Sequence, residues 1–132
     1  MDASAAEELT VRSVTFFETA LTDGAYVAWV AAPLEQPTLL VAGGGAQRRK
    51  LLPRPDHAHP DRVVDEEALI VNIYTDPAWR RRGIAVLVMH AILDWTQAEG
   101  ITRVVLHASA AGRSMYERLG FVANNEMRYE SR

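Results

Sequence analysis

Three segments of the chain repeat apolar residues at the spacing of an α-helix. They are residues 4–21, 82–99 and 111–120. Ser4 and Glu7 can form a capping box at the start of the first helix, and Gly100 and Gly120 end the other two. The apolar positions of the middle segment fall on one side of the helix, so we expect that side to pack on a sheet.

Segments with strand-like composition lie between these helices. Residues 25–32 and 38–43 are apolar and joined by a turn at 33–37, which predicts an antiparallel hairpin. The glycines at 43–45 indicate a strand end or a bulge, because they have no side chains to pack. Prolines, histidines and charged residues then predict a long surface loop over 46–65.

The next segment, 67–75, is almost continuously apolar in its middle, which indicates a central strand of the sheet. Residues 101–108 predict another strand, and the intervening helix makes a strand–helix–strand crossover. Residues 121–122 and 127–130 are expected to close the sheet. The predicted order is α-β-β-β-α-β-α-β, an α/β (α+β) fold with a mixed sheet, in one domain over residues 1–132.

Composition and charge narrow the range of functions. The chain has 132 residues, 48% of them hydrophobic, and a net charge of -3 from 17 acidic and 14 basic residues. Nucleic-acid-binding proteins usually have a basic excess, so we expect no nucleic-acid partner. The lack of cysteine excludes disulfides, thiolate metal sites and cysteine nucleophiles. No apolar stretch reaches membrane-spanning length and the N-terminus lacks signal-peptide features, so we predict a cytoplasmic protein without a membrane partner.

The sequence RRRGIA places three arginines, at positions 80–82, where the middle helix is predicted to begin. A helix N-terminus already carries partial positive charge, so arginines are unfavourable there unless an anion binds. Gly83 lets the backbone approach such an anion, and Ala85 is too small to block it. The alternatives are a solvated charge run and a duplex-binding patch, but the only other basic cluster is at 48–50. An anion site is the favoured interpretation.

Two sequence elements resemble a known family. WRRRGIA is similar to the Gln/Arg-x-x-Gly-x-Gly/Ala signature of the GNAT superfamily of N-acetyltransferases, with Arg80, Gly83 and Ala85 at its fixed positions. SMYERLGF, at residues 114–121, resembles the Tyr-x-x-Leu-Gly-Phe element of the same superfamily. The resemblance covers residues 4–130 and implies a GNAT-like mixed sheet with helices on both faces.

The resemblance implies acetyl-CoA as the cofactor. Its pyrophosphate would lie on the backbone amides of the turn, and its pantetheine arm would bond to the backbone of Ile73 and Thr75. An N–H near Ile73 or Tyr74 would receive the acetyl carbonyl oxygen. Ser109 stands where many relatives carry Asn, and Arg113 either reaches a phosphate or faces solvent. The implied cofactor-binding residues are Ile73, Tyr74, Thr75, Arg80, Arg81, Arg82, Gly83, Ile84, Ala85, Ser109 and Arg113.

The resemblance also implies direct transfer of the acetyl group to a primary amine. Tyr116 would be the general acid that protonates the CoA thiolate, because a phenol pKa of about 10 is close to a thiol pKa of about 8.5. The alternative is that Tyr116 packs its ring with Met115 and Leu119. A direct attack requires no covalent enzyme intermediate, which agrees with the lack of cysteine.

The general base is less clearly indicated. Residues 65–67 place three carboxylates at the start of the central strand, and we take Glu67 as the candidate base, with a solvated loop end as the alternative. Asn72 and His107 are candidate acceptor-binding residues, although either can be structural and His107 can also be a base or cofactor contact. The DHAH sequence at 56–59 lacks further clustered ligands, so we expect no metal.

An acyl-CoA-binding sensor or regulatory subunit without turnover is the alternative to an acetyltransferase. The family usually begins with a further strand and helix that help to form the acceptor side, and we expect this chain to lack them. The presence of Tyr116 favours the enzyme, with a small-molecule or peptide amine as acceptor. A homodimer is one way to cover a missing edge strand.

Overall fold

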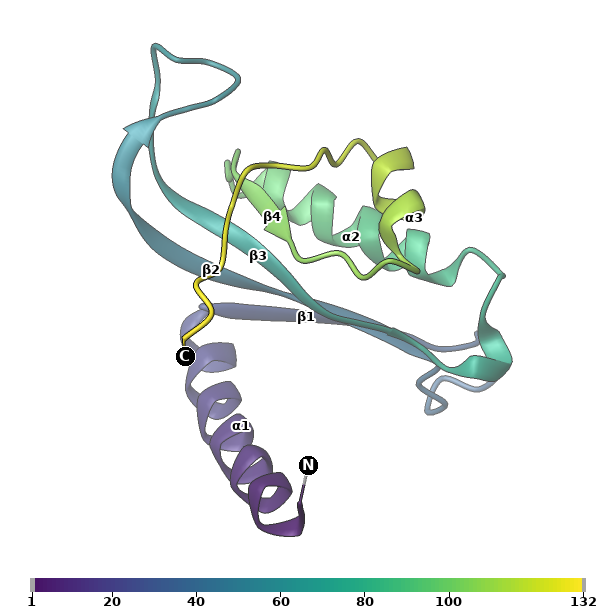
Figure 1. Cartoon of the computed structure of the whole chain (residues 1–132). Coiled ribbons are helices and arrows are strands. Elements are labelled where there is room, and N and C mark those ends of the chain that lie inside the picture. The colour runs from purple at the N-terminus through teal and green to yellow at the C-terminus, as the bar shows by residue number, and fades with distance from the viewer. Residues whose placement is uncertain (1, 132) are drawn as a thin grey trace.

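A computed structural model of the chain describes residues 2–131. The elements follow one another in the order α1 (Ala3–Asp23), β1 (Tyr26–Ala31), β2 (Ala42–Pro55), β3 (Val63–Thr75), the 3-10 helix η1 (Pro77–Trp79), α2 (Ile84–Ala98), β4 (Val104–Leu106) and α3 (Arg113–Arg118). Figure 1 shows α2 and α3 on one face of the sheet and α1 on the other side. The predicted mixed fold with helices on both faces is therefore confirmed.

The four strands form one sheet in the order β1-β2-β3-β4. The first two pairings are antiparallel, whereas β3 and β4 are parallel and are linked by the crossover through α2. β3 is paired on both sides, which confirms that the apolar segment 67–75 is a central strand. The carboxyl end of such a strand, next to a crossover helix, is where open α/β sheets bind ligands.

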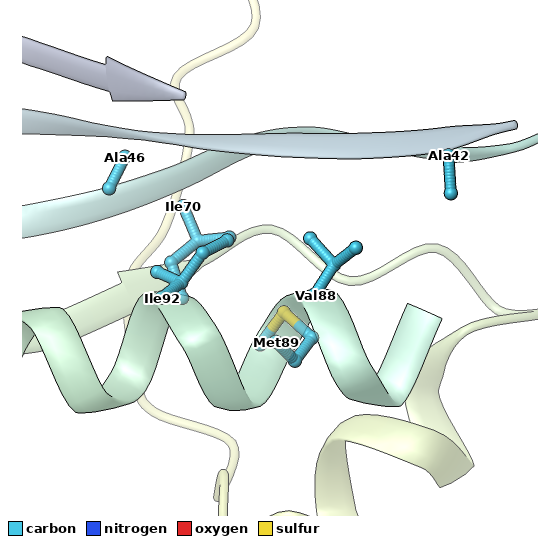
Figure 2. Packing of buried hydrophobic residues seen from close by; sticks show 6 residues of the cluster. All are labelled: Ala42, Ala46, Ile70, Val88, Met89 and Ile92. Carbon is cyan, nitrogen blue, oxygen red and sulfur yellow. The ribbon is translucent and has the colours of Figure 1, made fainter. Parts of the chain in front are cut away.

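The core lies between α2 and the middle of the sheet. Figure 2 shows Val88 and Ile92 of α2 directed at the small side chains of β2 and at Ile70 of β3. The buried cluster consists of Ala42, Ala46, Ile70, Val88, Met89 and Ile92. Gly44 of β2 also faces α2, and a side chain there would collide with Ile73 and approach Val88. Small residues on β2 therefore allow α2 to lie close to the sheet.

The long loop predicted over 46–65 is wrong, because β2 and β3 extend through most of it as a hairpin. Opposite charges on the two strands pair across this hairpin. Arg48 Nε donates to Glu66 at 2.9 Å, and Arg49 pairs with Glu67. Cross-strand ion pairs stabilise a ladder without producing an apolar repeat. Hydrophobic periodicity therefore could not reveal these strands.

Three smaller predictions also need correction. The second strand begins at Ala42 rather than at 38, and it runs through the glycines instead of ending there. Asp2, rather than Ser4, caps α1, where its side chain accepts a backbone N–H at 2.7 Å. Residues 121–131 form neither helix nor strand. The short β4, with three residues paired to β3, receives no further strand from this segment, which is exposed after Phe121.

α1 is the longest helix and is mostly exposed. Of its 21 residues only Ala20 is buried. It meets the sheet where the Phe17 ring packs against Tyr26 of β1, with ring centroids 4.7 Å apart. Within residues 2–131, no helix combines the length and the apolar character needed to cross a membrane.

Candidate functional site

The turn between β3 and α2 exposes a row of backbone amides. Gly83 precedes α2 in the left-handed conformation with φ of 76°, and Arg81 also has a positive φ of 63°. No side chain caps the helix, and within residues 2–131 the amides of 81–86 donate to no protein acceptor. These N–H groups lie at the positive end of the helix dipole, which suits them to bind an anion.

The three arginines surround this turn without ion pairs of their own. Arg80 Nε donates to the Thr75 carbonyl at 3.1 Å, and the Arg82 guanidinium lies 4.7 Å from the centroid of the Trp79 ring. None of the ion pairs formed within residues 2–131 involves an arginine of the turn. Positive charge therefore accumulates beside unpaired amides, which supports the anion site over a solvated charge run.

β3 contains a bulge just before this turn. Gly43 pairs with Tyr74 and Gly45 pairs with Val71, so two residues of β3, at 72 and 73, lie opposite Gly44 alone. Asn72 takes the left-handed conformation with φ of 60°. A bulge of this kind bends a strand and redirects the peptide groups that follow it.

The bulge coincides with the end of the parallel ladder. β4 pairs with β3 only as far as Ile70. Asp76, directly after β3, donates its N–H to the Val41 carbonyl on the β2 side, and the Thr75 carbonyl accepts from Arg80 Nε at 3.1 Å. The peptide groups of a strand alternate between its two neighbours, so those of Thr75 face away from β2. Within residues 2–131 no strand pairs with this edge beyond Ile70, so apart from the Arg80 bond it presents backbone groups to a ligand with amide groups.

The loop before α3 brings Ser109 and Tyr116 together. Ser109 Oγ accepts the Gly112 N–H at 3.2 Å, and a Cβ on Gly112 would lie 3.1 Å from the Tyr116 ring. The Tyr116 ring is half-buried and packs on the core cluster. It meets the Phe121 ring edge-on, with the ring centroids 6.1 Å apart. Burial raises the pKa of the Tyr116 hydroxyl, so it stays protonated at neutral pH.

Comparison with known proteins agrees with this arrangement. Residues 4–121 match the model of the acetyltransferase (GNAT) family, which is most of the chain. The chain belongs to the GNAT family. The matched range includes the arginine turn, the edge of β3 and Tyr116.

Individual relatives support the same assignment. A curated relative, the [ribosomal protein bS18]-alanine N-acetyltransferase of Salmonella typhimurium, is 34% identical over 62 residues, which is 45% of this chain and 42% of that protein. A GCN5-related N-acetyltransferase structure from Ralstonia eutropha JMP134 aligns with a TM-score of 0.82 and 28% identity, covering 99% of this chain and 81% of that one. A predicted acetyltransferase with acetyl-CoA from Clostridium acetobutylicum has a TM-score of 0.75 and 22% identity, covering 89% and 71% of the two chains.

Glu67, the predicted base of this GNAT domain, lies in a different setting from the one that a base requires. It is 3% exposed and pairs with both Arg49 and Arg103, the latter at 2.9 Å. Burial alone would raise its pKa, but hydrogen bonds from the two arginines outweigh burial and hold the pKa below its usual range. A carboxylate held in its ionised form is a weak proton acceptor, so its setting favours a structural role, and a catalytic role stays an untested prediction.

The remaining predicted residues lie around the site without forming one cluster. His107 is exposed just after β4, and Tyr74 is 55% exposed on β3. Arg113 pairs with Glu117 at 2.8 Å, on the exposed side of α3. Within residues 2–131, no group of three or more His, Asp or Glu side chains is arranged to hold a metal ion.

Sequence reasoning missed two features that shape the site. The bulge in β3 has no apolar signature, and the sequence indicated Asn72 only as an acceptor-binding residue. Tyr26 was part of a predicted strand, yet it is 6% exposed and its hydroxyl accepts the Asn72 Nδ2–H at 3.2 Å. Asn is the non-glycine residue best tolerated at positive φ. An Asn within an otherwise apolar strand was therefore the sequence feature that could have indicated the bulge.

Glu67→Gln tests the structural role of the carboxylate. The lowered pKa means that Glu67 stabilises the fold above its unfolded pKa of about 4.3, and that this contribution is lost as the pH falls through the lower folded value. Removing the charge leaves Arg49 and Arg103 without their partner. The free energy of unfolding at pH 7 should fall by about 2 kcal/mol, a moderate loss since both arginines keep partial solvent contact.

Urea unfolding at pH 7 and pH 3.5, about one unit below the unfolded value, measures this contribution. We expect Glu67→Gln to be less stable than the native chain at pH 7, with a smaller difference at the lower pH. Asp65→Asn, at an exposed position of the same strand, is the control. Native stability for Glu67→Gln, combined with lost activity, would contradict the structural role and support the base.

Proposed function

We propose that this GNAT chain transfers the acetyl group of acetyl-CoA to a primary amine. The observation that carries the proposal is a pair of backbone segments, the amides of residues 81–86 and the edge of β3 at Ile73 and Thr75 beyond its ladder with β4, where the Thr75 carbonyl is bonded to Arg80 Nε. The first suits a pyrophosphate and the second suits the amide groups of pantetheine. Membership of the family and the likeness to the Clostridium acetobutylicum structure, which is of an acetyltransferase with acetyl-CoA, support this cofactor.

The residues of the turn fit a pyrophosphate. A Cβ on Gly83 would meet no atom within 4 Å, so the space above the turn is open to a ligand. The amides of Gly83, Ile84 and Ala85 would hold the phosphate oxygens, with the arginine side chains adding charge. Arg80 would have to exchange or share its bond to the Thr75 carbonyl when Thr75 also binds pantetheine.

The bulge fits the reacting end of the cofactor. Asn72 and Ile73 together lie opposite Gly44, and the N–H of Ile73 would donate to the acetyl carbonyl oxygen. That bond would strengthen as negative charge develops on the oxygen, which lowers the barrier to attack. Asn72 and Tyr74, exposed on the same part of β3, would border the acceptor.

The chemistry is a direct substitution at the thioester. Acetyl-CoA supplies the carbonyl carbon that a neutral amine attacks, and the C–S bond breaks as the new C–N bond forms. The Tyr116 hydroxyl would donate its proton to the leaving sulfur and regain one from solvent. The amine would lose its extra proton through water, and no side chain of this chain is assigned as that base.

Thermal shift and a thiol-release assay with an amine panel test the proposed function. We expect CoA and acetyl-CoA to raise the melting temperature, because they bind only the folded chain, and at least one amine to release CoA thiol. Stabilisation by CoA without turnover of any amine would instead support an acyl-CoA sensor. Unchanged melting with both compounds would contradict cofactor binding altogether.

Gly83→Ala should weaken CoA binding about tenfold, because a side chain there strains the left-handed turn and occupies the space of the pyrophosphate. Gly120→Ala is a matched control, since Gly120 also has positive φ and open surroundings but lies after α3. Titration calorimetry measures both affinities. Equal losses in the two variants would show that strain alone, and not contact with the cofactor, explains the effect.

Tyr116→Phe should lower kcat about a hundredfold, because a general acid typically contributes at least that factor. The affinity for CoA should change little, since the ring and its packing on the core are kept. Tyr129→Phe, at an exposed site, is the control. A kcat that equals the native value at every pH would remove Tyr116 as the acid.

A further inference from the structure

Tyr26 lies at a position where three elements meet. It belongs to β1, its ring packs against Phe17 of α1, and only 6% of it is exposed. Gly45 of β2 lies so close that a Cβ there would overlap the Tyr26 hydroxyl. The absence of a side chain at residue 45 is thus what allows this hydroxyl to extend across β2 toward β3.

The Tyr26 hydroxyl ends at the bulge of β3. It accepts the Nδ2–H of Asn72 at 3.2 Å, and Asn72 is the residue with φ of 60°. Asn tolerates the left-handed conformation better than other residues with a side chain, but it also adopts ordinary strand conformations, so the surroundings decide which one it keeps. The bond to a buried, packed tyrosine is such a constraint, because it fixes the side chain of the strained residue itself.

The strained residue directly precedes the peptide group that matters for the reaction. The Asn72–Ile73 peptide carries the N–H that the proposed function assigns to the acetyl carbonyl oxygen. A rotation of ψ at Asn72 would turn that N–H away from the open edge of β3. Gly44, opposite the bulge, leaves room for Ile73 beneath the sheet but supplies no side chain that could hold Asn72.

We propose that Tyr26 is a positioning residue of the acyl-transfer site, which holds the bulge at Asn72 so that the Ile73 N–H points at the acetyl oxygen. Tyr26 touches neither the thioester nor the amine in this account. The inference rests on the proposed function, in which the Ile73 N–H donates to the acetyl carbonyl oxygen. It predicts an effect on recognition of the acetyl group, separate from the affinity for the rest of CoA.

The first experiment compares the Kd of acetyl-CoA with the Kd of CoA by titration calorimetry. Both compounds share the pyrophosphate and the pantetheine arm, so the ratio of the two Kd values reports the acetyl contact. Tyr26→Phe keeps the ring that packs on Phe17 and removes only the hydroxyl. We expect it to reduce the preference for acetyl-CoA about fivefold, the value of one hydrogen bond, and to leave the Kd of CoA unchanged.

A second variant separates positioning from general stability. Asn72→Gly takes positive φ without help, so it should preserve the bulge without the hydroxyl. Tyr26→Phe should therefore have little effect on the Kd ratio in the Asn72→Gly background, whereas it has its full effect in the native background. Asn72→Ala, which loses both the amide and the tolerance of positive φ, should lower the ratio at least as much as Tyr26→Phe.

Two further variants serve as controls for the chemical changes themselves. Tyr129→Phe and Asn125→Ala make the same chemical changes at exposed positions and should leave the ratio unchanged. A native chain that binds neither compound would overturn the proposed function and this inference with it. A native chain that binds both, with a ratio insensitive to Tyr26→Phe, would overturn the role of Tyr26 alone. Equal losses with and without Asn72→Gly would also overturn it.

Discussion

The structure depends on the point at which β3 loses its parallel neighbour. As far as Ile70 the peptide groups of β3 pair on both sides, and beyond it one side is left open. Backbone N–H and C=O groups that lack a hydrogen-bond partner are costly to bury. This edge and the amides at the start of α2 are places where the chain itself supplies no strand or helix partner for them. A ligand with an anionic group and an amide-containing arm would satisfy both at once.

Small residues on β2 are as important for the packing beneath this edge as the large apolar residues of α2. Ala42 and Ala46 let α2 approach the sheet and carry the arginine turn with it. Gly44 leaves room for Ile73, and Gly45 leaves room for Tyr26. Residues 42–46 of β2 therefore allow α2 to pack on one face of the sheet. On the opposite face they allow Tyr26 to reach the bulge.

The sequence carried more information about the turn than about the sheet. RRRGIA and YERLGF identified the family, and RRRGIA predicted the turn at the start of α2, because such motifs depend on local chemistry, namely glycine at positive φ and a helix start. The β2–β3 hairpin escaped detection because ion pairs such as Arg49–Glu67 hold it without an apolar repeat. The same pairing favours a structural role for Glu67, which the sequence indicated as the candidate base. The Tyr26–Asn72 bond joins residues 46 positions apart, and no pattern in one sequence predicts such a contact.

We propose that unpaired backbone amides, rather than the arginine side chains alone, form the cofactor site. Hydrogen–deuterium exchange of single amides, with and without saturating CoA, tests this claim most directly. We predict slower exchange on CoA binding at residues 81–86 and at Ile73 and Thr75, with unchanged exchange in the hairpin loop at 56–62. CoA binding that leaves the amides of 81–86 unprotected, or that protects the hairpin loop instead, would contradict the account.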